Sequence, residues 1–404
     1  MRCALVGAVL IALGCSDGTA PTPALLTSLP RPLTGEEAAL IQSSNAFTLG
    51  LFQKTSAAEP QKNVFLSPLS ASMMLGMTLN GARSGTFDAM RSALQFGVQS
   101  QTDINSSYKS LISLLIGLDP TTEMRIANSI WYRNTLQINP AFVTASHDYF
   151  DAEVSALDFA KPDQAKQTIN GWVNDKTAGR IPTIVDQIEP DQVMYLINAI
   201  YFKGQWRAAF DRGATKMESF SPGAGGLQSV PMMHLEGNEF RGSIWTDGTK
   251  HVDLPYGNGA FNMSVYLPPD TSSIESFVSR LNVTDLMRSD YGFALKLWLP
   301  RVKLEYERRL NGDLSALGMG IAFTDAADFS GMTTNGHPMV ISEVLQKTFL
   351  SIDEEGTEAA AVTKGAMADS APLELVMRCD RPYLIVIRER LSGTIVFIGK
   401  INSI

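Results

Sequence analysis

The segment "IDEEGTEAAAVTKGAMADSAP", Ile352–Pro372, combines two conflicting structural preferences. Its centre, "TEAAAV", is rich in good helix formers, of which Ala is the best. The flanking runs read as β-strands, with "VISEVLQKTFLSI" (Val340–Ile352) before the segment and "PYLIVIRE" and "GTIVFIGKI" after it. A small, apolar and weakly charged segment between strands is a candidate for a part of the chain that has to adopt two structures.

Composition places the chain among ordinary globular proteins. The 404 residues are 45% hydrophobic and 18% charged, which suffices for one large domain or two smaller ones. The net charge is -8 and the pI about 5.2, and no run rich in Lys or Arg occurs. A nucleic-acid partner is therefore not expected, because it would require a basic surface.

The N-terminus predicts export. Residues 1–15 read as a signal peptide, with a positive charge at Arg2 and an apolar run from Cys3 to Gly14 that is shorter than the ~20 residues of a membrane-spanning helix. Gly14-Cys15 resembles a bacterial lipoprotein cleavage site, which makes Cys15 a candidate lipidation site; a plain signal peptide cleaved nearby is the alternative. The protein is thus expected to be extracellular or a cell-envelope lipoprotein, touching a membrane only through such an anchor.

The rest of the chain divides into a linker and one folded unit. Residues 16–35, rich in Pro, Ser and Thr, predict an exposed tether, and residues 36–404 predict the folded domain. Helices come first and strands later without regular alternation, so the expected class is α+β. The expected helices are 36–55, 67–82, 85–94, 103–118, 140–150, 162–177, 273–287 and 311–317; the expected strands are 194–202, 251–256, 261–269, 294–307, 340–352, 382–389 and 393–401.

No motif for catalysis or metal binding is found. The four histidines (His147, His234, His251 and His337) lack the spacing of helical metal ligands, and the three cysteines form no CxxC pair. Nucleophile-elbow, phosphate-loop and dinucleotide fingerprints are missing as well. A Ser-His-Asp triad assembled only in three dimensions stays open, and Cys379, at the entry to an apolar strand, is better explained as a buried thiol than as a nucleophile. We therefore expect no enzyme, metal or cofactor.

Five segments, in this order, resemble the serpin family: "NVFLSPLSASMMLGMTLNGARSGT", "INGWVNDKTAGRIPTIV" with "LINAIYFKGQW", "LPRVKLEYERRLNGDLSALGMGIAF" with "ADFSGM", "VISEVLQKTFLSIDEEGTEAAAVT", and "DRPYLIVIRERLSGTIVFIGKI". The resemblance extends from about Glu36 to Ile404, and the N-terminus suggests a bacterial member. It implies one α+β domain with three β-sheets, eight or nine helices and an exposed reactive-centre loop.

The resemblance also implies a mechanism. In inhibitory serpins a target serine protease, or in some cases a cysteine protease, attacks the loop and forms a covalent acyl-enzyme complex. The cleaved loop then inserts as a new strand in the main sheet. Such an inhibitor is a suicide substrate, acts as a monomer and needs no catalytic residue of its own. The alternative is a non-inhibitory serpin with a binding or chaperone-like role; "EEGTEAAAVT" favours inhibition, because non-inhibitory members tend to lose the small residues there.

The alternation of side chains along the loop is compatible with insertion, because alternate residues of a strand face opposite sides of a sheet. Starting from Thr357, the inward set is uncharged, and both charges, Glu358 and Lys364, belong to the outward set. Gly356 supplies backbone freedom at the hinge. The predicted hinge comprises Glu354, Glu355, Gly356, Thr357, Glu358, Ala359, Ala360 and Ala361, and the inward set is Thr357, Ala359, Ala361, Thr363, Gly365 and Met367.

The resemblance assigns a second group of residues to the opening of the main sheet: Ser67, Ser70, Asn198, Gln346, Trp206 and Arg301. Gln346 departs from the family, which commonly has a histidine at this position, but Gln also donates and accepts hydrogen bonds. Two alternatives stay open, in which Ser67 is a simple helix N-cap and Trp206 a core aromatic residue. Arg301 and Glu354 match a family ion pair that contributes ~0–1 kcal/mol if it is exposed.

The scissile bond is the least defined feature. The family's scissile residue usually lies sixteen positions beyond the residue that matches Glu354, and 354 + 16 gives cleavage between Ser370 and Ala371. A shift of one residue gives Asp369, while Met367 suits an elastase-like or chymotrypsin-like protease. Because the window holds no Arg or Lys, a trypsin-like target is the least expected.

Overall fold

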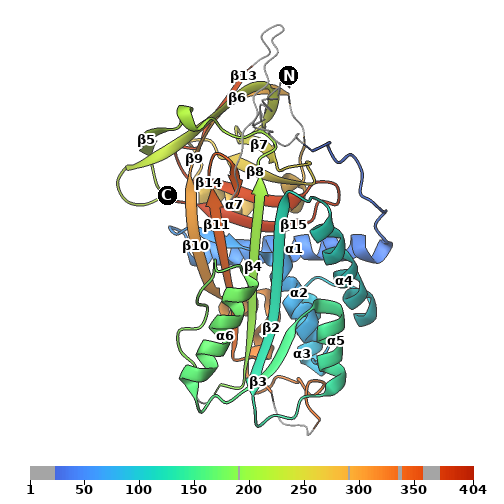
Figure 1. The fold of residues 1–404 in the computed structure, drawn as a ribbon. Coiled ribbons are helices and arrows are strands. Elements are labelled where there is room, and N and C mark those ends of the chain that lie inside the picture. The colour runs from blue at the N-terminus through green and yellow to red at the C-terminus, as the bar shows by residue number, and fades with distance from the viewer. Residues whose placement is uncertain (1–22, 190–191, 290–291, 335–338, 358–373) are drawn as a thin grey trace, which may run out of the picture.

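The computed structural model describes residues 23–189, 192–289, 292–334, 339–357 and 374–404. Figure 1 shows long strands lying side by side down the molecule, one helix (α6) across their front face and further helices behind them. The described residues form nine α-helices: α1 (Gly35–Ala58), α2 (Pro68–Leu79), α3 (Ser84–Ala93), α4 (Gln101–Gly117), α5 (Pro140–Phe150), α6 (Pro162–Lys176), α7 (Ile274–Arg280), α8 (Val283–Leu286) and α9 (Asn311–Leu314).

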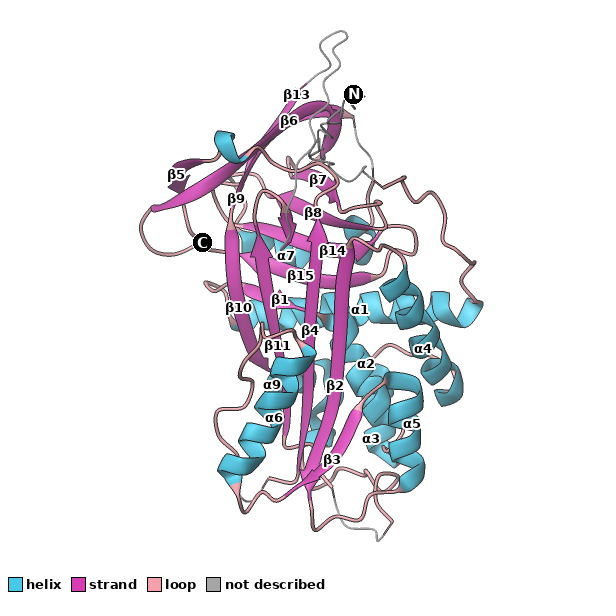
Figure 2. Cartoon of the chain, in the orientation of Figure 1, coloured by secondary structure: helices cyan, strands magenta, loops and turns pink. Residues whose placement is uncertain are grey.

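The strands of Figure 2 belong to two hydrogen-bonded networks. The first, here called the main sheet, has the order β10 (Val302–Arg309), β11 (Glu343–Ile352), β4 (Met194–Gln205), β2 (Thr122–Arg133) and β3 (Glu153–Leu157), and β12 (Gly356–Thr357) also pairs with β4. The second has the order β1 (Val64–Leu66), β15 (Ile395–Ile401), β14 (Tyr383–Glu389), β8 (Phe261–Leu267), β7 (Lys250–Pro255), β6 (Gln228–Ile244), β9 (Phe293–Pro300) and β13 (Glu374–Arg378), with β5 (Lys216–Phe220) beside β6.

The α+β class expected from the sequence is present, with three differences in detail. Two of the three expected sheets are continuous, because β6 pairs with β7 near its C-terminal end and with β9 and β5 along the rest of its length. The single strand expected at 294–307 is divided after Pro300 into β9 and β10, which belong to different networks. The helix expected at 273–287 is likewise two helices, because Asn282 begins α8 with a new capping box.

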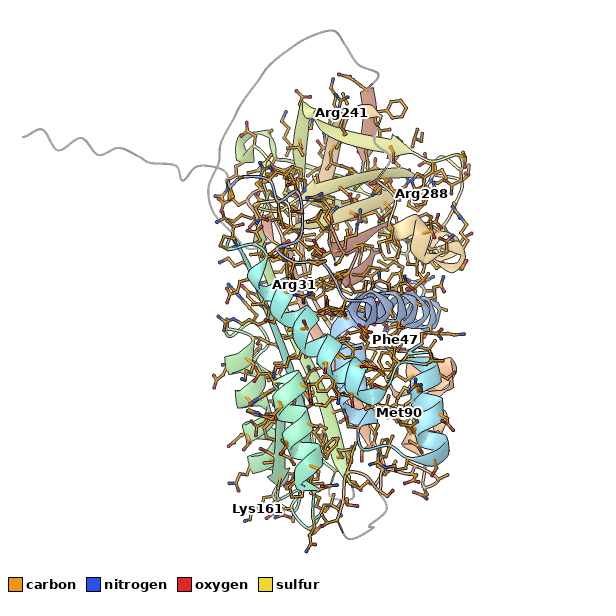
Figure 3. All side chains as sticks on the ribbon, turned by 90° about the vertical axis from the view of Figure 1, so that its right-hand side faces the viewer. Arg31, Phe47, Met90, Lys161, Arg241 and Arg288 are labelled. Atoms are coloured by element: carbon orange, nitrogen blue, oxygen red, sulfur yellow. The ribbon has the colours of Figure 1, made fainter. Side chains whose placement is uncertain are left out.

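The main sheet is covered on both faces. Its inner face packs on the large core of the molecule, which includes Phe47 of α1 (labelled in Figure 3) and the buried side chains of α2. A smaller cluster on the other face joins Ile169 and Val173 of α6 to Tyr195 and Ile197 of β4. A strand added to this sheet therefore has to fit between two packed layers.

The expected tether at 16–35 is wrong for residues 23–34, which lie along the body of the molecule. Three leucines of this segment (Leu26, Leu29 and Leu33) pack against the core and hold the segment against the body of the molecule. Arg31 contacts α4, where its guanidinium donates to the Ser110 hydroxyl over 2.7 Å, and it also pairs with Glu37 at 2.6 Å (Figure 3). Residues 16–22 lie outside the described part of the chain.

Candidate loop-insertion site

The upper end of the main sheet contains a place between β4 and β11 that is already partly occupied. The two strands pair in parallel from Glu343↔Tyr195 to Thr348↔Ile200, and both continue beyond these pairs. There β12 pairs with β4 in the antiparallel sense, with Gly356 opposite Gln205 and Thr357 opposite Gly204. The first residues of the predicted loop are thus part of the main sheet.

A tight turn brings the chain from β11 back to β4. The Asp353 carboxylate accepts hydrogen bonds from the backbone N–H groups of Glu355 (2.9 Å) and Gly356 (3.2 Å), and the Asp353 N–H donates to the Gly356 carbonyl over 3.0 Å. The Trp206 N–H donates to the Glu355 carbonyl over 2.9 Å. These bonds satisfy the backbone of the turn and reverse the chain direction.

Gly356 is required by close approach as well as by conformation. Its φ of +152° lies in a region that side-chain-bearing residues rarely adopt, and an added Cβ would stand 2.1 Å from the Gly204 oxygen and 2.8 Å from the Gln205 Cα. The freedom that the sequence predicted for this position is therefore used to place β12 directly against β4.

Thr357 is buried at the first inward position. It is 2% exposed, and its hydroxyl lies 2.8 Å from the phenol oxygen of Tyr256. The Tyr256 ring stacks on Trp206 with centroids 4.6 Å apart, and the indole N–H of Trp206 donates to the Asp353 carbonyl over 2.9 Å. Trp206 thus contacts the hinge and is also a core aromatic residue, so the two readings of this position do not exclude each other. Tyr256 was not predicted as a site residue, because it lies in an ordinary strand-end motif, "LPY".

The predicted ion pair joins Glu354 to Arg301. The Arg301 guanidinium donates to the two carboxylate oxygens at 2.6 to 3.0 Å, and the Thr215 hydroxyl donates to the same carboxylate. Burial by itself would raise the pKa of Glu354, but the hydrogen bonds from Arg301 and Thr215 outweigh it and hold the pKa below its ordinary value. Because Glu354 is only 1% exposed, the estimate for an exposed pair does not apply.

Four residues of the second predicted group meet beneath the main sheet, whereas Trp206 and Arg301 contact the hinge. The Gln346 amide on β11 donates to the Asn198 side-chain oxygen on β4 and to the Ser67 carbonyl, each over 2.8 Å, and it accepts from the Ser67 N–H over 3.0 Å. Asn198 in turn donates to the Ser70 hydroxyl. These four residues, here called the sheet-opening cluster, are at most 1% exposed and bridge the two strands that would separate.

Two further details of the cluster were not foreseen. Asn128 on β2 faces Asn198 and accepts a hydrogen bond from its amide over 2.8 Å. Ser67 stands at the N-cap of α2, but its hydroxyl makes no capping bond and donates instead to the Val396 carbonyl over 2.7 Å. The alternative of a simple cap is therefore wrong.

The predicted site residues Cys15, Glu358, Ala359, Ala360, Ala361, Met367, Asp369, Ser370 and Ala371 lie outside the described residues.

The described ranges contain no group of three or more His, Cys, Asp or Glu that could hold a metal ion. No helix in this part of the chain is both long and apolar enough to cross a bilayer. Cys379 is fully buried, and burial raises the pKa of its thiol, which disfavours the reactive thiolate.

Comparisons with known proteins agree with this geometry. A family model described as "Serpin (serine protease inhibitor)" matches residues 42–404. The leukocyte elastase inhibitor of Bos taurus is 32% identical over 90% of this chain and 99% of its own length. Among solved structures, the thermophilic serpin tengpin in the native state has a TM-score of 0.84 at 28% identity, covering 95% of this chain and 98% of tengpin.

A third comparison is human thyroxine-binding globulin complexed with thyroxine, with a TM-score of 0.82, 25% identity, and coverage of 91% of this chain and 99% of that one. The fold and the hinge geometry thus define a serpin-type architecture, and the chain belongs to the serpin family. Members of this family are mostly protease inhibitors that form complexes with their target proteases, rather than enzymes, although some are non-inhibitory.

Proposed function

We propose that this protein inhibits serine-type endopeptidases as a suicide substrate, by cleavage of its reactive-centre loop and insertion of the loop between β4 and β11. One observation carries the proposal. In the pairing of β12 with β4 the two residue numbers add to 561 (356 + 205 and 357 + 204). Continuing this register along β4 to Met194 reaches loop residue 367, since 561 − 194 = 367. A strand of residues 356–367 would match the whole length of β4.

The same register fits the alternation of side chains in the loop. Directly paired residues of an antiparallel ladder project to the same face of the sheet. Gly204, which lies opposite Thr357, is on the same face of β4 as Phe202, Ile200, Leu196 and Met194. These four side chains belong to the large core. The loop residues opposite β4 positions 202, 200, 198, 196 and 194 would be Ala359, Ala361, Thr363, Gly365 and Met367, which are uncharged and mostly small.

The outward residues of the inserted strand would not all face solvent, because part of this face of the main sheet is covered by α6. Glu358 would pair with Lys203, of opposite charge, at the upper end of β4. Lys364 would pair with Ile197, which packs in the cluster under α6. Its long aliphatic stem would have to run beneath the helix and carry the ammonium group to the edge. Insertion therefore requires α6 to move away from the sheet at the position of Lys364.

The energy of insertion comes from added backbone pairing. Parting β4 from β11 breaks a ladder of six residue pairs, and a strand of about a dozen residues pairs on both of its sides instead. At ~0.5–1.5 kcal/mol for each hydrogen bond, a net gain of about ten bonds is worth on the order of 10 kcal/mol. Before cleavage the loop is fixed at Thr357 in β12 and at Glu374 in β13, so this pairing cannot form.

The deciding experiment mixes the purified protein with a panel of elastase-, chymotrypsin-, acid- and trypsin-specific serine proteases and with a cysteine protease. We expect a covalent complex that survives SDS with at least one of them. The mass of the released C-terminal peptide then identifies cleavage after Ser370, Asp369 or Met367. The similarity to human thyroxine-binding globulin makes a binding protein the second candidate. The absence of a complex with every protease, together with no gain in thermal stability after loop cleavage, would favour that candidate.

We further propose that the protein is exported and anchored through Cys15. Since residues 23–34 are docked, only residues 16–22 would separate the lipid from the body. Such a linker spans at most about 28 Å. The carbonyl of Pro23 accepts a hydrogen bond from Arg207, the residue after Trp206, so the anchor would keep the hinge end of the molecule near the membrane. Labelling with a radioactive fatty acid, lost in Cys15→Ser, tests this proposal; an unlabelled native protein would contradict it.

A further inference from the structure

Tyr256 begins a turn that is held from several directions. The Gly257 N–H donates to the Gln205 carbonyl of β4 over 2.9 Å. Asn258 donates from its amide to the Leu118 carbonyl over 2.8 Å, and its carbonyl accepts from the Leu26 N–H over 2.8 Å. The backbone that carries the Tyr256 side chain is therefore fixed relative to β4, the end of α4 and the docked N-terminal segment.

The Tyr256 side chain is in turn fixed by aromatic packing. Its ring stacks on Trp206 and meets the edge of Phe202 at a centroid distance of 5.2 Å. Gly204 allows this approach, because a Cβ at that position would stand 2.8 Å from the Tyr256 ring. The residue is 0% exposed, and its hydroxyl has the Thr357 hydroxyl as its hydrogen-bond partner.

We infer that Tyr256 is a positioning residue that seats Thr357 in the main sheet before the loop is cleaved. The two buried hydroxyls satisfy each other. Withdrawal of Thr357 would leave the phenol without this partner in a closed aromatic site, which opposes withdrawal. Strand addition would then start from a placed first residue, with Ala359 as the next inward side chain. The consequence for inhibition rests on the proposed function, whereas the seating itself does not.

Hydrogen exchange of the intact, full-length protein tests the seating without a protease. Tyr256→Phe keeps the ring and its stack on Trp206 and removes only the hydroxyl, and Thr357→Val keeps the shape of the loop residue. Each variant is expected to speed exchange of the Gly356 and Thr357 amides about 2- to 10-fold, the loss expected for one hydrogen bond. The double variant should exchange no faster than the faster single variant, because both changes remove the same interaction.

Tyr383→Phe is the matched control. Tyr383 is also fully buried, and its hydroxyl has no hydrogen-bond partner among the described residues, so its removal should leave exchange at the hinge unchanged. Unchanged exchange in Tyr256→Phe, or additive effects in the double variant, would overturn the seating.

Inhibition provides the second readout. If the native protein traps a protease, Tyr256→Phe should raise the number of inhibitor molecules consumed for each protease trapped. The melting temperature of Tyr256→Phe is compared with that of Tyr383→Phe and should match it. Faster hinge exchange with unaltered consumption would overturn the role of the seat in insertion. Faster exchange in a protein that traps no protease would support the seat and contradict the proposed inhibition instead.

Discussion

Replacement of Thr357 by arginine tests loop insertion at its first step. In the structure this side chain is 2% exposed and its hydroxyl contacts the Tyr256 phenol, between two packed layers. An arginine here would lose the hydroxyl pair and bring a guanidinium into a buried site beside Tyr256, whose ring stacks on Trp206. The variant is therefore expected to keep the loop end outside the sheet.

The size of the effect follows from the burial. An unpaired buried charge costs several kcal/mol after relaxation of the surroundings, and ~4 kcal/mol is a moderate figure. If half of this cost is present in the transition state for insertion, the activation free energy rises by ~2 kcal/mol and insertion slows about 30-fold. Hydrolysis of the acyl-enzyme is unaffected, so the ratio of hydrolysis to insertion rises about 30-fold and a larger share of the inhibitor is cleaved as a substrate.

The assay titrates a fixed amount of protease with increasing inhibitor and follows the remaining activity and the SDS-stable complex. Thr357→Arg should raise the number of inhibitor molecules cleaved as substrate for each protease trapped about 30-fold and should accumulate the cleaved form. Met217→Arg adds the same charge at a residue of β5 that is 63% exposed and serves as the control, which should trap protease normally. Trapping by Thr357→Arg at the native stoichiometry would refute the insertion mechanism.

Three further perturbations have defined outcomes. Gln346→Ala removes the amide that bridges to Asn198 and leaves buried groups unpaired, so urea unfolding should show a loss of ~2–3 kcal/mol; no loss would contradict the bridging role. Glu354→Gln should be less stable than the native protein above pH ~4.5, because the folded-state pKa is lowered; the difference should shrink as pH falls through that lowered pKa, and a difference independent of pH would contradict the ion pair. Arg31→Met leaves the buried Glu37 carboxylate without its guanidinium, so limited proteolysis should cut residues 23–34 faster; equal rates would show that other contacts hold the segment.

The sequence predicted the elements whose pattern is local. Helices α2 and α5 begin at a proline preceded by a polar residue and appear within a few residues of their expected bounds. The apolar strands β14 and β15 were equally visible, because they are buried along their whole length. The class and the family followed from these blocks.

The elements that were missed depend on partners distant in the chain. β2 has an irregular burial pattern and is held by its long antiparallel pairing with β4, which no local pattern reveals. The docking of residues 23–34 was missed for a similar reason. Prolines and small polar residues suggested a linker, while the leucines between them have buried sites formed by other segments. Tyr256 and Asn128 were missed at the candidate site because each gains its role only through a contact across strands.

The two threonines of the inward set connect the hinge to the sheet-opening cluster. In the register proposed above, Thr357 lies opposite Gly204 and Thr363 would lie opposite Asn198, since 561 − 363 = 198. Parting β4 from β11 breaks the bond from the Gln346 amide to Asn198, which would leave the Asn198 side-chain oxygen and one of the two N–H bonds of the Gln346 amide without this partner. A threonine hydroxyl arriving between them both donates and accepts, so it offers each a new partner.

The remaining inward residues, Ala359, Ala361, Gly365 and Met367, carry no polar side chain. The loop thus places hydroxyls at the two levels where the sheet contains buried polar partners, and Thr363→Val should impair insertion more than Ala361→Val does. Equal trapping by these two variants would show that the cluster finds its new partners elsewhere.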